Sequence, residues 1–171
     1  MRLLIYFIIS AILISLQTTV IPALPVLLSP YDLLIPFVVY FTLFRPLAES
    51  LPVIIITGCA MDMLSGAPIG IYMFVYAWIL LLFTKAKLYL HLRDPVLFQM
   101  IVIIGILIEN IIFGLFFAFQ AMSFDLSLYA CQIVLIQLVW VFLTIPFIFI
   151  VFDYGFGAID KLISGGLKKS L

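Results

Sequence analysis

Charged residues, cysteine and histidine are all scarce in this sequence. Only 9% of its 171 residues are charged, compared with about a quarter in an average soluble domain. So few charged side chains cannot cover a surface that faces water, and the composition therefore excludes a soluble enzyme and a disordered tail. The formal net charge is 0, so we expect no binding to nucleic acid. The two cysteines, Cys59 and Cys131, lie inside apolar runs and indicate no disulfide framework.

Apolar residues make up 67% of the chain, and its mean hydropathy is +1.42. One membrane span takes about 20 apolar residues, so the chain has room for about five or six transmembrane helices and for no extramembrane domain. The apolar runs predict helices over residues 3–21, 31–44, 51–64, 69–84, 95–120 and 128–152. The second to fourth runs are short for a membrane, so these helices tilt little, extend into their loops or pack inside the protein.

The positions of the basic residues predict the orientation. With six spans, all lysines and arginines fall on one side of the membrane: Arg2, Arg45, Lys85, Lys87, Arg93, Lys161, Lys168 and Lys169. The positive-inside rule places that side, and with it both termini, in the cytoplasm. We therefore predict an all-α integral membrane protein with a six-helix transmembrane domain over residues 1–152. A cytoplasmic tail over residues 153–171, either amphipathic or frayed, would follow it.

Glu109 lies near the middle of the fifth apolar run, where a charge costs several kcal/mol unless it is paired or hydrated. A proton- or ion-coupled carrier would use such a carboxylate. The alternative, which we favour, is a structural carboxyl group that bonds Gln132, Gln137 or a backbone carbonyl. Gly105, one helical turn earlier on the same face, would let another helix approach closely there.

The stretch from Gly58 to Gly70 combines small and polar residues between two short apolar runs. If the third helix continues through it, Gly58, Asp62 and Ser65 with Gly66 lie on one face. Asp62 would then cap the unpaired N–H groups of the next helix or accept a hydrogen bond across helices. The segment from Ser65 to Gly70 predicts a tight reversal, in which Pro68 lies near the start of the fourth helix.

No constellation of residues predicts catalysis, a metal site or a cofactor, so we expect a protein that is not an enzyme. The residues that we select are instead candidates for structural or partner-interface roles. They are Gly58, Asp62, Ser65, Gly66, Pro68, Gly70 and Glu109.

The spacing Gly58-x-x-x-Asp62-x-x-Ser65-Gly66-x-Pro68-x-Gly70 resembles the rod shape-determining MreD family. The resemblance extends over nearly the whole chain through its length, its six-span hydropathy and its lack of soluble domains. It implies a component of the bacterial inner membrane that serves cell elongation. It also implies that the protein binds MreC and, through MreC, is linked to MreB, RodA and a class B penicillin-binding protein that make peptidoglycan along the side wall.

The resemblance further implies a fold similar to the S subunits of energy-coupling-factor transporters, which leaves two functions open. The favoured one is a non-catalytic scaffold of the elongation machinery. The alternative is the substrate-binding membrane subunit of a vitamin-type uptake transporter. A ladder of small residues, Ala11, Ser15 and Thr19, would let the first helix dock another helical protein in either case.

Overall fold

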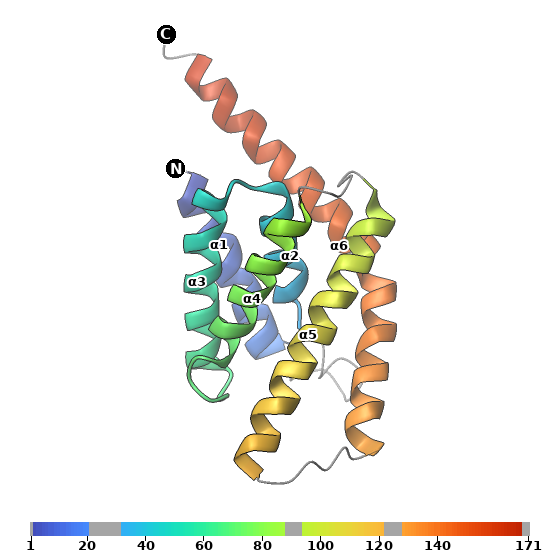
Figure 1. The fold of residues 1–171 in the computed structure, drawn as a ribbon. Helices are drawn as coiled ribbons and strands as arrows, with labels where there is room; N and C mark the ends of the chain where they lie inside the picture. The colour runs from blue at the N-terminus through green and yellow to red at the C-terminus, as the bar shows by residue number, and fades with distance from the viewer. Residues whose placement is uncertain (1, 21–31, 88–93, 122–127, 169–171) are drawn as a thin grey trace.

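The computed structural model describes residues 2–20, 32–87, 94–121 and 128–168, and the regular structure within these ranges is helical. The helices are α1 (Arg2–Ser15, extended by a π-helical turn, η1, Leu16–Val20), α2 (Leu34–Phe44), α3 (Leu47–Leu64), α4 (Ile71–Ala86), α5 (Pro95–Ala121) and α6 (Leu128–Lys168). Five of them match the predicted runs to within four residues, whereas α6 continues well past the predicted end at residue 152. The helices run up and down side by side, and α1 begins at the end of the bundle where α6 finishes (Figure 1).

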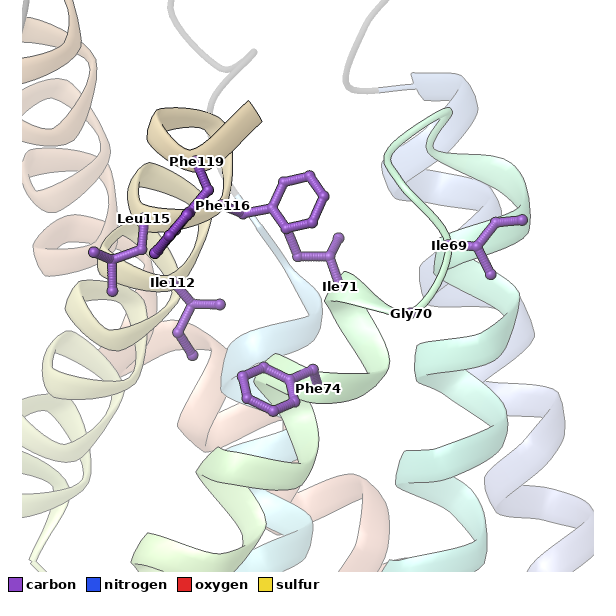
Figure 2. Close-up of a pocket in the computed structure, with 8 residues that line it drawn as sticks. All are labelled: Ile69, Gly70, Ile71, Phe74, Ile112, Leu115, Phe116 and Phe119. Carbon is purple, nitrogen blue, oxygen red and sulfur yellow. The ribbon is translucent and has the colours of Figure 1, made fainter. Parts of the chain in front are cut away.

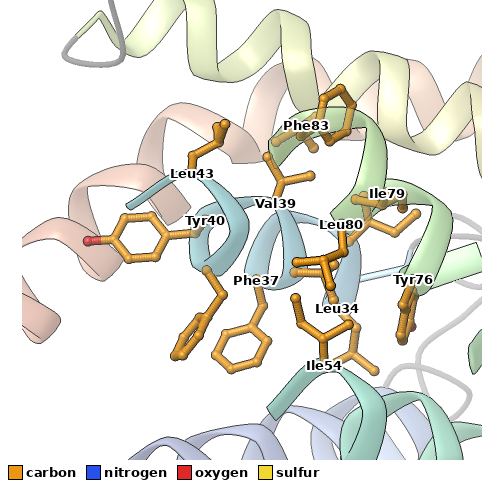
Figure 3. Close-up of a cluster of buried hydrophobic side chains, with 14 of the residues drawn as sticks. Leu34, Phe37, Val39, Tyr40, Leu43, Ile54, Tyr76, Ile79, Leu80 and Phe83 are labelled. Carbon is orange, nitrogen blue, oxygen red and sulfur yellow. The ribbon is translucent and has the colours of Figure 1, made fainter. Parts of the chain in front are cut away.

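The short helix α2 lies at the centre of the bundle. Ten of its eleven residues, from Leu34 to Leu43, are buried, and it contacts α1, α3, α4, α5 and α6. Figure 3 shows its side chains between those of α3 and α4. A helix that is apolar on every side is stable when protein surrounds it completely. Of the three explanations for the short runs, packing inside the protein is therefore the one that applies to α2.

Aromatic rings tie α1, α2 and α6 together at the end of the bundle where α1 begins. The Tyr6 and Phe41 ring centroids are 4.9 Å apart, and the rings of Tyr40 and Phe156 stack at 5.2 Å. The Arg45 guanidinium lies 5.3 Å from the Tyr6 ring centroid and 5.4 Å from that of Phe156. Such edge-to-face and cation–π contacts each contribute about 0.5–2 kcal/mol. Because Phe156 is part of this cluster, the packed region of α6 extends beyond residue 152.

Helix α6 continues without interruption past residue 152 to Lys168. In Figure 1 its second half leans across the bundle and projects beyond the other helices. The helix contains Pro146, a residue type that removes one backbone hydrogen bond and bends helices. Because α6 is continuous to Lys168, the predicted tail begins as a direct extension of the sixth helix.

The outer surface is strongly apolar, above all on α5 and α6. Large side chains such as Val139, Leu143 and Phe147 are each about 70% exposed, whereas soluble monomers rarely expose large apolar side chains in extended patches. Three segments are long and apolar enough to cross a membrane: Leu47–Leu64, Pro95–Phe119 and Gln132–Gly157. The other three helices are apolar but shorter. The surface is that of a membrane protein.

Candidate functional site: two buried carboxylate positions

Asp62, near the end of α3, caps the start of α4. Its Oδ1 accepts a hydrogen bond from the backbone N–H of Tyr72 at 2.9 Å, and its Oδ2 accepts one from Met73 at 3.3 Å. The first N–H groups of a helix have no partner within the helix, so a carboxylate at this point satisfies them and also interacts favourably with the helix dipole. This is the capping arrangement expected from the sequence, and it links the two helices of the hairpin.

Gly58 places the backbones of α3 and α4 in direct contact one turn before Asp62. A Cβ atom at this position would lie 2.8 Å from the Cα of Met73 and 3.2 Å from its nitrogen. The neighbouring Cys59 also reaches α4, with its Sγ 3.6 Å from the Sδ of Met73. Two successive turns of α3, at Gly58 and Asp62, therefore hold the same point of α4.

The turn between α3 and α4 differs from the prediction in two respects. Ser65 and Gly66 are exposed, so the small polar face ends at Asp62. Gly66 and Gly70 have φ angles of 71° and 97°, and a Cβ at either would meet nothing within 4 Å. Glycine is needed there because L residues rarely adopt the left-handed conformation. A bulky residue at Gly66 would therefore strain the turn without forcing α3 and α4 apart.

Pro68 lies near the start of α4, as predicted, three residues before the helix begins at Ile71. Its carbonyl accepts a hydrogen bond from the N–H of Ile71 at 3.3 Å, within the turn. The Oγ of Ser65 accepts a hydrogen bond from the N–H of Ala67 at 3.3 Å. Both residues thus stabilise the reversal, and Ser65 also hydrogen-bonds the side chain of Tyr72 on α4.

A second buried carboxylate, Asp32, lies at the start of the central helix α2. Its Oδ1 accepts a hydrogen bond from the N–H of Leu34 at 2.7 Å, and its Oδ2 accepts one from the hydroxyl of Tyr76 at 3.2 Å. Tyr76 lies on α4 and is fully buried. No pattern in the sequence predicts this pairing, because the two residues are 44 positions apart.

Glu109 on α5 joins this second group. Its side chain is 7% exposed and hydrogen-bonds that of Asp32, while its Oε2 has no partner among the described residues. Gln137, one of the partners proposed for it from the sequence, instead accepts a hydrogen bond from Asn110 at 2.8 Å. Gln132, another proposed partner, is exposed. The expected pairing with a glutamine is therefore wrong, and the partner is a second carboxyl group.

Gly105 explains how the two carboxyl groups meet. A Cβ at this position would lie 3.2 Å from the Cγ2 of Ile35 and 3.6 Å from that of Val39. Helix α5 therefore packs closely on α2, as the position of Gly105 suggested. Glu109 lies one turn after Gly105 on α5, and Asp32 lies three residues before Ile35, just ahead of α2. The same packing therefore brings Glu109 to Asp32.

One hollow on the surface of the described residues has an apolar lining. It has a volume of about 420 Å³ and lies between the start of α4 and the second half of α5, and its eight lining residues are apolar or glycine (Figure 2). Ile71 and Phe74 line it from α4, and Ile112 and Phe116 line it from α5. A site for a small polar molecule also needs a few polar groups to orient the ligand, and the side chains that line this hollow carry none. Among the described residues, no group of three or more His, Cys, Asp or Glu side chains is arranged to hold a metal ion.

Comparison with known protein families identifies the family to which this chain belongs. The family profile described as rod shape-determining protein MreD matches residues 1–155. The chain belongs to the MreD family. Searches of curated proteins and of solved structures found no match. The matched range includes Asp32, Asp62 and Glu109 and most of the packed bundle. This member of the MreD family is a rod shape-determining membrane protein.

Proposed function

We propose that this MreD-family protein is a non-catalytic, multi-pass scaffold of the bacterial inner membrane that binds MreC. Through MreC it would be linked to MreB, RodA and a class B penicillin-binding protein, and so would help to organise peptidoglycan synthesis along the side wall. The observation that carries this proposal is the family match over residues 1–155. The apolar outer surface supports it, because a scaffold in a membrane works through helix contacts.

Helix α1 offers a face suited to such a contact. Ala11, Ser15 and Thr19 are exposed along one side of the helix and its π-helical extension, and Ala11 and Ser15 line a shallow groove. Small side chains let two helix backbones approach closely in a membrane, where packing rather than the hydrophobic effect drives association. We therefore expect the transmembrane helix of MreC to dock on this face.

Affinity purification of the tagged protein from native membranes tests the proposal. We expect wild-type protein to retain MreC and cell-wall synthases, and the Ser15→Leu variant to lose most of the MreC. Gly114→Leu is the matched control, since Gly114 is also exposed on a helix and a Cβ there meets nothing within 4 Å. Unchanged MreC recovery with Ser15→Leu would exclude the α1 face as the site that binds MreC, but it would not exclude the scaffold function. Recovery of an ATPase pair with a transmembrane coupling subunit, without MreC, would instead support the uptake function.

The proposed orientation has six spans with both termini in the cytoplasm. In support of it, Arg45, Lys85 and Lys87 share one end of the bundle, where the Lys87 amine donates a hydrogen bond to the Arg45 carbonyl at 3.2 Å. After replacement of Cys59 and Cys131, an impermeant thiol reagent added from outside should label a cysteine at position 65 but not one at position 87. The reverse pattern would overturn the orientation.

A further inference from the structure

The contact between Asp32 and Glu109 is unusual because it joins two acidic side chains inside an apolar bundle. Asp32 is 5% exposed and Glu109 is 7% exposed. An ionised carboxylate contains only hydrogen-bond acceptors. The two side chains are placed to hydrogen-bond each other, and they can do so only if one of them carries a proton.

The other hydrogen bonds indicate which of the two holds the proton. Asp32 already accepts bonds from the Leu34 N–H and the Tyr76 hydroxyl, and donors of this kind stabilise an anion. Glu109 receives no such donor at Oε2. An unpartnered oxygen costs far less on a neutral acid than on a buried anion. The proton therefore belongs on Glu109, which donates it to the Asp32 carboxylate.

The surrounding groups do not provide a positive charge. Tyr76 and Tyr72 face the pair from α4, and Asp62 on α3 lies near enough to Tyr72 to interact with it. Asn110 and Gln137 pair with each other between α5 and α6. No interaction of Glu109 with a lysine, arginine or histidine occurs in the described part of the chain. One proton is thus what balances the pair.

We propose that Asp32 and Glu109 form a proton-binding site between helices α2 and α5, occupied by one proton held on Glu109. Removal of the proton would place two negative charges in contact one turn from Gly105, where α5 packs closely on α2. Two like charges in contact repel each other strongly in a medium of low polarity. Occupancy of the site therefore controls how tightly α5 packs on the central helix.

The proposal can be tested on the purified full-length protein in lipid by infrared spectroscopy, which distinguishes the carbonyl band of a protonated carboxyl group from the bands of a carboxylate. At neutral pH we expect one such band in wild-type protein and its loss in Glu109→Gln. Asp153→Asn is the control, since Asp153 is an exposed carboxylate on α6, and it should leave the band unchanged. Asp32→Asn, which keeps Glu109, should retain the band but shift its frequency because the proton loses its anionic acceptor.

Three results would overturn the proposal. The first is the absence of a protonated-carboxyl band in wild-type protein at neutral pH. The second is a band that persists in Glu109→Gln or does not move in Asp32→Asn. The third is loss of the wild-type band when sodium chloride replaces choline chloride, which would show that the site binds a metal cation instead. Asp32→Asn gives an independent answer if Glu109→Gln does not fold.

Discussion

Replacement of Gly58 by alanine is the smallest change that tests the packing of α3 on α4. The added Cβ would lie 2.8 Å from the Cα of Met73, whereas two carbon atoms in normal contact are about 3.5–4.0 Å apart. The nearest atom belongs to the backbone of α4, so no side-chain rotation relieves the overlap. One helix must move away from the other, and the cap that Asp62 provides must move with it.

The magnitude follows from comparison with Gly114→Ala. Alanine stabilises a helix interior by about 0.5–1 kcal/mol relative to glycine. At Gly114, where a Cβ meets nothing within 4 Å, we expect this gain alone. At Gly58 the same gain is opposed by overpacking, which costs about 1–3 kcal/mol. Because both sites are in helices, the difference between the two variants isolates the cost of the overlap. The free energy of unfolding of Gly58→Ala should therefore be lower than that of Gly114→Ala by about 1–3 kcal/mol.

The measurement is the free energy of unfolding of each purified variant in mixed micelles, titrated with a denaturing detergent. Wild-type protein provides the reference for both changes. Equal unfolding free energies for Gly58→Ala and Gly114→Ala would refute the reasoning, since they would show that the close contact at Met73 does not limit stability.

Three further predictions concern the capping aspartate, the turn and the buried pair, and the same titration measures each. Asp62→Ala should lower the free energy of unfolding by about 0.5–2 kcal/mol, and Asp62→Asn by less, because its single amide oxygen still accepts one of the two N–H bonds; equal losses would contradict the cap. Gly70→Ala should lower the free energy of unfolding by about 1–2 kcal/mol, because alanine would be strained at the Gly70 φ of 97°. An unchanged free energy of unfolding would show that the turn does not require glycine there. Glu109→Gln should be tolerated, since its amide donates to Asp32 as the protonated acid does, while Glu109→Leu should cost about 1–3 kcal/mol; a glutamine variant that accumulates normally yet loses rod-shape activity would favour the carrier function.

The sequence by itself determined the features that depend on neighbours close along the chain. Apolar runs punctuated by proline and charge predicted the presence of all six helices and the bounds of five of them to within four residues, but not the extension of α6 to Lys168. The spacing from Gly58 to Gly70 predicted the hairpin and the cap by Asp62, whose partners at Tyr72 and Met73 lie only ten and eleven residues away. The same spacing also carried the resemblance to the MreD family, which the match over residues 1–155 confirms.

Only the tertiary structure decided which faces of the helices meet. Helix α2 is apolar almost all round and α5 is mostly apolar, so hydropathy gives little indication of which side of each helix faces protein and which faces lipid. The rotation and register of each helix are therefore set by close contacts between distant segments, such as Gly105 against Ile35. For that reason the central position of α2, and the meeting of Asp32 with Glu109 and Tyr76, could not be read from hydropathy or spacing.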